Sequence, residues 1–513
     1  MSLELPAGWV AVTLEDIVTK LVDGSHNPPK KQTSGLPMAS AKNIRDGDID
    51  LTDVRLITAE AFEQENSRTQ VLPGDILLTI VGAIGRTAVV HDNLPKFTLQ
   101  RSVAVVRPES VDSSFIAYTF ESPNVQKWLD SKAKGTAQKG VYLKTLRQMP
   151  LGVPPLLEQK RIVKKINHLK GLSRRARAAL EAVEPLLEKF RQSVLAAAFR
   201  GDLTADWRAQ NPDVEPASKL LERVRRERRQ RWEEAELEKM RAKGRVPRDD
   251  RWKKKYKEPG EVDRTGLPDL PEGWDWATLE HLKAFEPNSL TDGPFGSKLK
   301  TADYVQEGIR VIRLGNIGVG EFKDENTAYI SQEKYLSLRK HEIFPGDLVI
   351  AALAEPVGRA TLVPTEVGKA IVKADCIRMK PLTCFSNLYL MHCLNSPDGR
   401  SRAELLSHGV GRLRINMANM RSLPIPVAPL AEQALLVTRV EGTLCQVNEL
   451  KQTQAALCHK LNHLDQSILT QAFQGQLVPQ DPNDEPASVL LERIRKAREA
   501  QAKAKKGRRR KRS

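Results

Sequence analysis

The sequence predicts an α+β multidomain protein: two mixed, strand-rich globular domains separated by two long helices that pack as an antiparallel coiled coil. Three observations predict it. The chain repeats itself once at an offset of about 265–274 residues, each copy begins with strand-like runs, and each copy continues with a heptad pattern. A repeat of this length excludes a solenoid, whose units have about 20–50 residues. Tandem duplication also predicts a pseudo-twofold relation between the copies.

The repeat consists of phrases that recur in the same order. "LPAGW" from Leu5 returns as "LPEGW" from Leu270, and "EPASKLLERVR" from Glu215 returns as "EPASVLLERIR" from Glu485. The other pairs are "DGSH" and "DGPF", "KNI" and "GNI", "LPGD" and "FPGD", "PPLLEQ" and "APLAEQ", and "QSVLAAAF" and "QSILTQAF". The 513 residues therefore form two large, similar halves.

The first part of each copy is expected to be a strand-rich domain, over residues 1–155 and 266–429. Runs such as "DILLTIVG" and "DLVIAALA" are short, apolar and bounded by Gly, Pro, Asn or Asp, as is typical of strands joined by loops.

The second part of each copy is expected to be a long helical spacer, over residues 156–221 and 430–500. A proline precedes the Glu and Gln of a first helical turn in both copies. Apolar residues then recur alternately every four and three positions, which is the pattern of a coiled-coil seam. The predicted seam consists of Ile162, Ile166, Leu169, Leu180, Val183, Leu187, Phe190 and Val194 in the first copy, and Leu436, Val440, Val447, Leu450, Leu457, Leu461, Leu464 and Ile468 in the second. An interior proline kinks or breaks a helix, so Pro185 leaves open whether the first helix is one piece or two collinear pieces.

The net charge of +17 is concentrated in two stretches. Residues 222–257 contain 16 Lys/Arg and 8 Asp/Glu, and the tail from Lys503 contains 8 Lys/Arg and no acidic residue. We expect a basic helical or linker segment over 222–265 and a basic disordered tail over 501–513. Two polycationic stretches favour a polyanionic partner such as nucleic acid.

The chain lacks the sequence signatures of an enzyme. It has no GxxxxGK[ST] loop, no HExxH, and five cysteines without a CxxC pair. "HNPPK" from His26 resembles a methyltransferase base-holding loop, but Lys30 replaces the aromatic residue. A nuclease could use Asp75, Glu158 and Lys160, yet the last two are better explained as a first helical turn. We expect a non-catalytic, cytoplasmic protein with no cofactor or metal of its own and no membrane segment.

Loops of both copies carry residue types that bind DNA. Glycine lets the backbone approach a surface, and Lys, Arg and Asn hydrogen-bond phosphates and base edges. "KAKGTAQKGVYLKTLRQMP" from Lys132 corresponds to "HGVGRLRINMANMRSLP" from His408. The predicted DNA-binding residues are Lys42, Asn43, Lys139 and Lys144 in the first copy, and Lys298, Asn316, Arg412, Arg414 and Asn416 in the second.

These phrases, in this order and twice, resemble the specificity subunit of type I restriction–modification systems. The resemblance implies two target recognition domains, each reading one half of a split double-stranded DNA site, with no active site in this chain. It also implies partners: two methyltransferase subunits that carry S-adenosylmethionine, and restriction subunits that use ATP and Mg for translocation and cleavage. Two alternatives remain open, a coiled-coil scaffold that reads no DNA and a self-contained DNA methyltransferase or nuclease.

Overall fold

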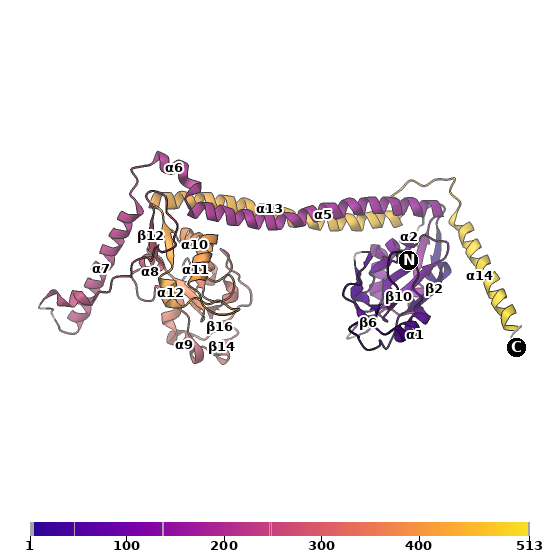
Figure 1. The fold of residues 1–513 in the computed structure, drawn as a ribbon, viewed down its shortest axis with the longest axis horizontal. Helices are drawn as coiled ribbons and strands as arrows, with labels where there is room; N and C mark the ends of the chain where they lie inside the picture. The colour runs from indigo at the N-terminus through magenta and orange to yellow at the C-terminus, as the bar shows by residue number, and fades with distance from the viewer. Residues whose placement is uncertain (1–4, 46, 136–137, 246, 248, 511–513) are drawn as a thin grey trace. The chain divides into compact units, whose positions relative to one another are not determined.

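The computed structural model describes residues 5–45, 47–135, 138–245, 247 and 249–510, with side chains described as far as Ala500. The chain divides into two compact units (Figure 1). The first comprises Met1–Ala182 with Gln454–Ser513, and the second comprises Val183–Thr453. Each unit holds one globular domain together with a part of both long helices.

The globular domain of the first unit is built on a four-stranded antiparallel sheet with the order β2-β10-β7-β8. Its strands are β2 (Val18–Asp23), β10 (Val103–Pro108), β7 (Ile76–Thr79) and β8 (Thr87–Val89). A three-stranded sheet β6-β3-β9 and the ribbon β4-β5 lie beyond it. Their strands are β3 (Leu36–Ala39), β4 (Ile44–Arg45), β5 (Asp48–Ile49), β6 (Arg55–Ile57) and β9 (Thr98–Leu99). The helices of this domain are α1 (Ala59–Thr69), α2 (Ser113–Glu121), α3 (Pro123–Lys132) and α4 (Leu143–Arg147).

The second unit repeats this sheet in the same order, β13-β21-β18-β19. Its strands are β13 (Leu290–Asp292), β21 (Cys376–Met379), β18 (Leu348–Ala351) and β19 (Ala360–Leu362). The outer sheet differs, because here it has five strands in the order β14-β16-β15-β20-β17. These are β14 (Tyr304–Val305), β15 (Ile309–Ile312), β16 (Tyr329–Ile330), β17 (Glu342–Ile343) and β20 (Ala370–Val372). The helices are α8 (Leu279–Leu282), α9 (Gln332–Ser337), α10 (Asn387–Asn395), α11 (Pro397–Leu405) and α12 (Met417–Arg421).

The central sheets are buried on both faces, which explains their unbroken apolar runs. Every residue of β7 and β18 is buried. In the first unit Leu78 belongs to the core cluster that includes α2, while its neighbour Leu77 belongs to the cluster on the opposite face. A strand buried on both faces cannot alternate apolar and polar residues.

A short ribbon ties the start of each globular domain to its end. β1 (Val10–Thr13) pairs with β11 (Pro150–Val153), and β12 (Asp275–Thr278) pairs with β22 (Pro424–Val427), both antiparallel. The long helices α5 (Leu156–Phe199) and α13 (Leu430–Phe473) follow directly after β11 and β22.

The long helices pair antiparallel within each unit. In the first unit Arg177 donates to Asn462 and Asp465, at 2.7 and 3.1 Å. In the second unit Lys451 forms an ion pair with Glu188, at 3.5 Å. A second contact in each unit gives the direction: in the first unit Gln454 donates to Leu180 O, and in the second Arg439 donates to Leu203 O and Asp206, just beyond the end of α5. Within each unit, residue numbers therefore fall along α13 as they rise along α5, as antiparallel packing requires. Together with the repeated sheets, this pairing confirms the predicted fold class; the pseudo-twofold relation remains a prediction.

The predicted seam is correct at the helix ends and shifted in the middle. Eight of its residues are buried and four are half-buried, but Phe190, Leu450, Leu457 and Leu464 are 41–54% exposed. On α13 the inward positions are instead Lys451, Cys458 and Asp465. The physical reason is that polar contacts such as Arg177–Asp465 and Lys451–Glu188 lie between the two helices here. The leucines that precede the inward positions on α13 therefore face outward.

Pro185 does not divide the first helix, which runs without a break from Leu156 to Phe199. The proline side chain is exposed, so the helix accommodates its missing N–H group on the outer side. Of the two possibilities that the sequence left open, the structure shows one continuous helix.

The repeated "EPAS" phrases open two further helices, α7 (Ala217–Ala242) and α14 (Ala487–Arg510), and each helix covers the globular domain of the other copy. The backbone N–H of Ala217 donates to Gly273 O at 2.8 Å, and that of Ala487 donates to Gly8 O at 3.1 Å. The first turns of each helix join the apolar core of the domain that they cover.

These helices correct two expected boundaries. The borders at 221/222 and 500/501 fall inside α7 and α14. The expected disordered tail is wrong for residues 501–510, which continue α14, while residues 511–513 lie outside the described residues. The first long helix also ends at Phe199, before the short helix α6 (Ala205–Gln210).

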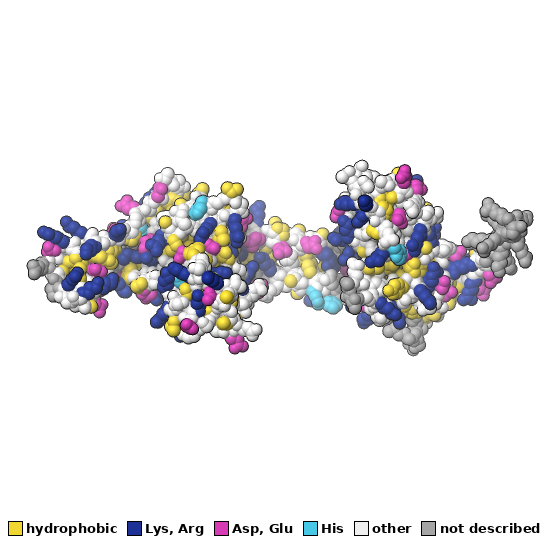
Figure 2. Space-filling view, turned by 90° about the horizontal axis from the view of Figure 1, so that it is seen from below, with side chains coloured by type: hydrophobic (Ala, Val, Ile, Leu, Met, Phe, Trp, Pro, Cys, Tyr) yellow, Lys and Arg dark blue, Asp and Glu magenta, His cyan; other side chains and the backbone are white. Residues whose placement is uncertain are grey.

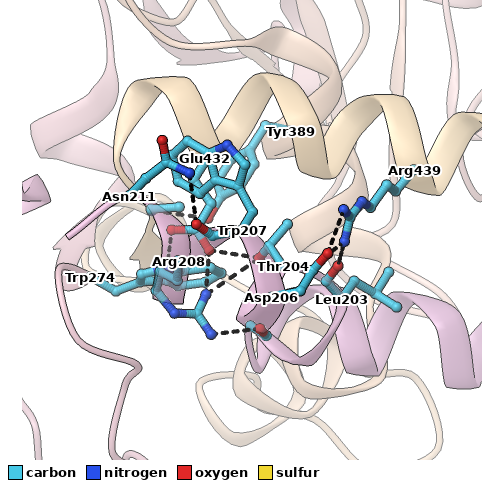
Figure 3. Close-up of polar contacts among 12 residues, drawn as sticks. Leu203, Thr204, Asp206, Trp207, Arg208, Asn211, Trp274, Tyr389, Glu432 and Arg439 are labelled. Carbon is cyan, nitrogen blue, oxygen red and sulfur yellow. Dashed lines mark hydrogen bonds and ion pairs between the residues drawn. The ribbon is translucent and has the colours of Figure 1, made fainter. Parts of the chain in front are cut away.

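A buried carboxylate on α13 joins this long helix to the "LPxGW" phrase, to the turn after α5 and to α6 in the second unit (Figure 3). Glu432 is 0% exposed and accepts hydrogen bonds from Trp274 Nε1 at 2.9 Å and Thr204 Oγ1 at 2.6 Å. It also pairs with the Arg208 guanidinium. In the first unit the corresponding Glu158 accepts from Trp9 Nε1 at 3.0 Å. Burial raises the pKa of Glu158, partly offset by this hydrogen bond and by Arg161.

One substitution between the copies predicts a pH response of the second unit. Asp16 accepts hydrogen bonds from Thr13 N and Oγ1, both at 2.8 Å. His281 takes its place in the second copy, with Nδ1 at 3.1 Å from Thr278 N and 2.8 Å from Thr278 Oγ1. Burial, reinforced by Arg225 and Arg228, lowers the pKa of His281 to about 4.

We therefore expect acid to destabilise the second unit through His281. A lowered folded-state pKa means that the stabilisation is fully present above the unfolded value of 6.5 and is lost as pH falls towards 4. The loss is on the order of 3 kcal/mol. His281→Asp, which restores the residue type of Asp16, is expected to remove this pH dependence. Urea unfolding monitored by hydrogen exchange between pH 7 and pH 4 measures it, and an unchanged pH slope in the variant would contradict the assignment.

Candidate nucleic-acid interface

One edge of each central sheet gathers the loops that carry most of the predicted DNA-binding residues. In the first unit Asp23 pairs with Ala104, Thr79 pairs with Val103, and β8 begins beside them at Thr87. Because neighbouring strands are antiparallel, the loops that follow β2 and β7 and those that precede β8 and β10 meet at this edge. The second unit places the loops around Asp292, Ala352 and Asp375 at the corresponding edge.

A short hairpin completes this edge in both units. In the first unit Lys134 and Gly140 exchange two backbone hydrogen bonds of 2.9 Å. In the second unit His408 and Arg414 exchange bonds of 3.0 and 2.9 Å. Each hairpin also bridges the loop after the third strand of the sheet, at Val81 and at Leu353. The backbone of this element is therefore duplicated, whereas its side chains differ.

Glycine is required in these hairpins. Gly135 and Gly409 both have a φ of +122°, and a Cβ would lie 2.4 Å from Gln138 O in the first and 2.6 Å from Arg412 O in the second. Either approach is closer than a real Cβ tolerates. The "KG" and "HG" dipeptides of the sequence thus mark a tight turn, as expected for loops whose backbone approaches another surface.

Exposed cations surround a surface depression at this edge of the first unit. It is lined by polar residues that include Lys42, Arg45, Arg86, Arg101 and Gln138. Arg45, Arg86 and Arg101 are exposed and form no ion pair with any residue that the structure describes. Their positive charge is therefore available to a ligand. Lys42 is different, because it pairs with Asp53 at 2.7 Å, and its hydrogen bond holds the pKa of Asp53 below the usual value.

The second unit has two depressions at the corresponding edge. One is lined by Arg313, Asn316, Lys373 and Arg412, among others, and the other by Phe295, Arg414 and Asn416, among others. Arg414 pairs with Asp375 at 2.9 Å and lies over the Phe295 ring, 5.2 Å from its centroid. Figure 2 shows Lys and Arg side chains spread over one face of this domain.

The predicted residues divide into three groups. Lys42, Arg412, Arg414 and Asn416 line the depressions, although Asn416 also caps α12 by accepting from Asn419 N at 2.8 Å. Lys139, Lys144 and Lys298 are exposed on the hairpin, on α4 and on the loop after β13. The remaining two, Asn43 and Asn316, have another role.

Asn43 and Asn316 hold their own loops together. Asn43 is 3% exposed, donates to Asp50 O and Asp53 O at 2.9 Å, and accepts from Ser40 N at 2.9 Å. Asn316 is 2% exposed and makes the equivalent three bonds to Lys323, Glu325 and Arg313. Their amides are used within the protein, which corrects the expectation that they contact DNA directly.

Sequence reasoning missed several residues of this edge: Arg45, Arg86, Arg101, Gln138 and Tyr142, which are exposed, and Arg313 and Lys373, which are half-buried. The repeat offset could have found two of them. Subtracting about 274 from Arg412 and Asn416 leads to Gln138 and Tyr142, which occupy the same places on the first hairpin. The arginines on separate loops carried no such signal.

The carboxylates considered for a nuclease are structural. Asp75 accepts from Arg107 at 2.6 and 2.8 Å, and its counterpart Asp347 accepts from Arg378 at 2.7 Å. Glu158 is bound by Trp9, as described above. Among the described residues there is no group of three or more His, Cys, Asp or Glu side chains placed to hold a metal ion. In the same part of the chain, no helix has both the length and the apolar composition to cross a membrane.

Comparison with known families gives a match over most of the chain. A family model described as the type I restriction modification DNA specificity domain matches residues 6–182 and 298–454.

Two relatives from Escherichia coli show the extent of the similarity. The type I restriction enzyme EcoKI specificity subunit of strain K12 is 24% identical over 97% of both chains. The EcoBI specificity subunit is 34% identical, over 44% of this chain and about half (49%) of that protein.

Solved structures share the fold. A chain of a type I R-M system, from a study of its complex assembly and conformational transition, superposes with a TM-score of 0.62 at 18% identity, covering 92% of this chain and all of that one. The HsdS subunit from Thermoanaerobacter tengcongensis gives a TM-score of 0.51 at 19% identity, covering 93% of this chain and 99% of that one.

Proposed function

This chain belongs to the type I restriction–modification DNA specificity family, and we propose that it is the sequence-reading subunit of such a complex in the cytoplasm. Each globular domain reads one half of a bipartite double-stranded DNA site. The chain itself catalyses nothing. It assembles two methyltransferase subunits, which carry S-adenosylmethionine, and restriction subunits, which use ATP and Mg.

The observation that carries the proposal is the duplicated loop edge. Both units present the same glycine-dependent hairpin beside the same loops, with cations that no described carboxylate neutralises. Between the copies the side chains change, as from Gln138 to Arg412 and from Tyr142 to Asn416. A constant backbone with variable polar side chains suits two readers that recognise different half-sites, since sequence is read by side chains at base edges.

Selection from randomised duplexes tests this proposal. The purified full chain, alone and with its methyltransferase partner, is expected to enrich a split site with two specified halves and an unspecified gap. A scaffold would enrich no sequence. Incubation of the chain alone with labelled S-adenosylmethionine and DNA is expected to transfer no methyl group, and transfer would favour the self-contained methyltransferase.

Two lysines at opposite ends of β20 provide a matched test of the loop edge. Lys373 follows the strand and lines the depression, whereas Lys369 precedes it and is exposed elsewhere. Lys373→Ala is expected to weaken DNA binding and to reduce the slope of log K against log salt by about 1, as for loss of one phosphate contact. Lys369→Ala is expected to leave both unchanged. Equal effects of the two substitutions in a salt titration would contradict the assigned surface.

A further inference from the structure

The distal end of α7 and the chain that returns from it form a strongly charged tip, residues 241–257. This segment contains nine Lys/Arg and two Asp. The first turns of α7 are buried against the second globular domain through Leu220, Leu221 and Val224. The contact continues with Arg228, which donates to His281 O and Lys283 O at 2.9 and 3.0 Å, and with Arg231, which lies over the Phe285 ring. Ala242 lies 11 residues beyond Arg231, so the tip stands about 16 Å along the helix from this last contact.

The described part of the tip, which excludes residues 246 and 248, has a defined structure. The returning 3-10 turn Asp250–Lys255 places Trp252 against Trp232 of α7, with ring centroids 6.1 Å apart and an interplanar angle of 22°. Tyr256 packs on Trp232 from 5.3 Å. These aromatic contacts hold the returning chain against α7 and so fix where its lysines are displayed.

The charge of the tip is not neutralised from within. Its two aspartates, Asp249 and Asp250, form ion pairs with Arg251 and Lys253 respectively, at 3.2 Å each. Six further cations are exposed and form no ion pair with any described residue: Arg241, Lys243, Arg245, Lys254, Lys255 and Lys257. Figure 2 shows this concentration of Lys and Arg over α7 and the residues that follow it, at the left end of the view.

The chemistry of the tip distinguishes between two kinds of partner. A stable protein interface has an apolar or aromatic centre that loses its water on binding. Here Trp232 and Trp252 stack on each other, and Trp252 is only 8% exposed. No large apolar side chain of the described tip is strongly exposed. What the tip offers is positive charge alone, which suits the evenly spaced phosphates of a nucleic acid.

The sequence repeats this design. α14, which corresponds to α7, contains most of a second polycationic stretch, "KAKKGRRRKRS", which begins at Lys503. The two stretches are not copies of one another, yet both follow the duplicated "EPAS" helix. A shared charge without a shared sequence indicates a partner that is recognised by charge.

We propose that the tip 241–257 is a sequence-independent clamp on the phosphates of DNA flanking the recognised site. It rests on the proposed function, because it extends the contact of a DNA reader. The tip stands beyond the globular domain and contributes no residue to the depressions at the loop edge, so we expect its contacts to fall on flanking duplex rather than on the bases read.

The test compares two triple variants of the full chain. Lys254, Lys255 and Lys257→Gln removes three cations of the tip. The matched control, Lys160, Lys164 and Lys165→Gln, removes three exposed lysines of α5 that form no ion pair with described residues. Binding is measured between 50 and 200 mM salt on the selected duplex with 20 flanking base pairs, on the same duplex without flanks, and on a random duplex.

The tip variant is expected to lower the salt slope on flanked DNA by about 2–3, at ~0.9 per phosphate contact. Across this salt range the wild type should then lose about 40-fold more affinity than the variant. The same change is expected on random DNA, and little on the duplex without flanks. The control variant should match the wild type.

Two results would overturn the clamp. One is an unchanged slope on flanked DNA while the wild type still binds its site specifically, which leaves the proposed function intact. The other is loss of assembly with the methyltransferase partner at an unchanged DNA slope, which would make the tip a protein-docking element. Failure of the wild type to bind any site specifically would instead refute the proposed function, and the clamp with it.

Discussion

Glu432→Ala is expected to lower the free energy of unfolding of the second unit by about 3–5 kcal/mol, the range for removing one partner of a buried ion pair. The substitution leaves the guanidinium of Arg208 without its ion-pair partner, and this side chain is only 19% exposed. It also takes away the acceptor of Trp274 Nε1 and Thr204 Oγ1. Urea unfolding, with hydrogen exchange to assign the loss to the second unit, measures the effect.

The first unit supplies the matched control. Glu158 also accepts from a tryptophan, but it has no direct ion pair among the described residues, and burial raises its pKa. A raised folded-state pKa means that this group's contribution is present at acid pH and is lost as pH rises through that value. Glu158→Gln keeps an acceptor for Trp9 and is therefore expected to cost nothing, or to stabilise, at neutral pH. With the same substitution at both sites, Glu432→Gln is expected to destabilise its unit, because it leaves Arg208 without its ion pair. Equal effects of Glu432→Gln and Glu158→Gln would contradict the distinction between the two junctions.

Exchange of residues 1–155 for those of another member of the family is expected to change one half of the recognised site completely and leave the other half intact. The reason is that the first globular domain carries its own loop edge, and that its core is completed by α5, α13 and α14, with no residue of 266–429. Discrimination between specific and random DNA is typically 10³–10⁷-fold, so the old half-site should become indistinguishable from random sequence. Sequencing of methylated sites, with partner subunits present, reads the outcome. A change in both halves, or in neither, would contradict the division of labour.

The repeat made the architecture predictable because a phrase that occurs in both copies makes the same structural contact in both. The tryptophan of "LPxGW" and the glutamate of "LLEQ" or "LAEQ" lie 149 residues apart in the first copy and 158 in the second, and in both they form one buried hydrogen bond. Sequence alone named both phrases without showing that they touch. It also gave no sign that each "EPAS" helix covers the domain of the other copy.

The candidate site was less predictable for two physical reasons. Residue type alone does not distinguish an asparagine that contacts a base from one that hydrogen-bonds within its own loop. Asn43 and Asn316 are of the second kind, because both are buried and donate to backbone carbonyls of their loops. Arg86 and Arg101 reach the surface from separate loops, so only the antiparallel sheet brings them together. The helix seam was misplaced where Arg177 and Asp465 occupy its centre, since the heptad rule assumes an apolar interior.

The most direct test of the central claim, that each globular domain reads one half of the site, is photo-crosslinking from the two matching hairpins. A photoreactive amino acid at Gln138 in one variant and at Arg412 in another reports which bases lie beside each hairpin on the selected duplex. We expect crosslinks from position 138 to one specified half and from position 412 to the other. Crosslinks from both positions to the same half, or to the unspecified gap alone, would contradict it.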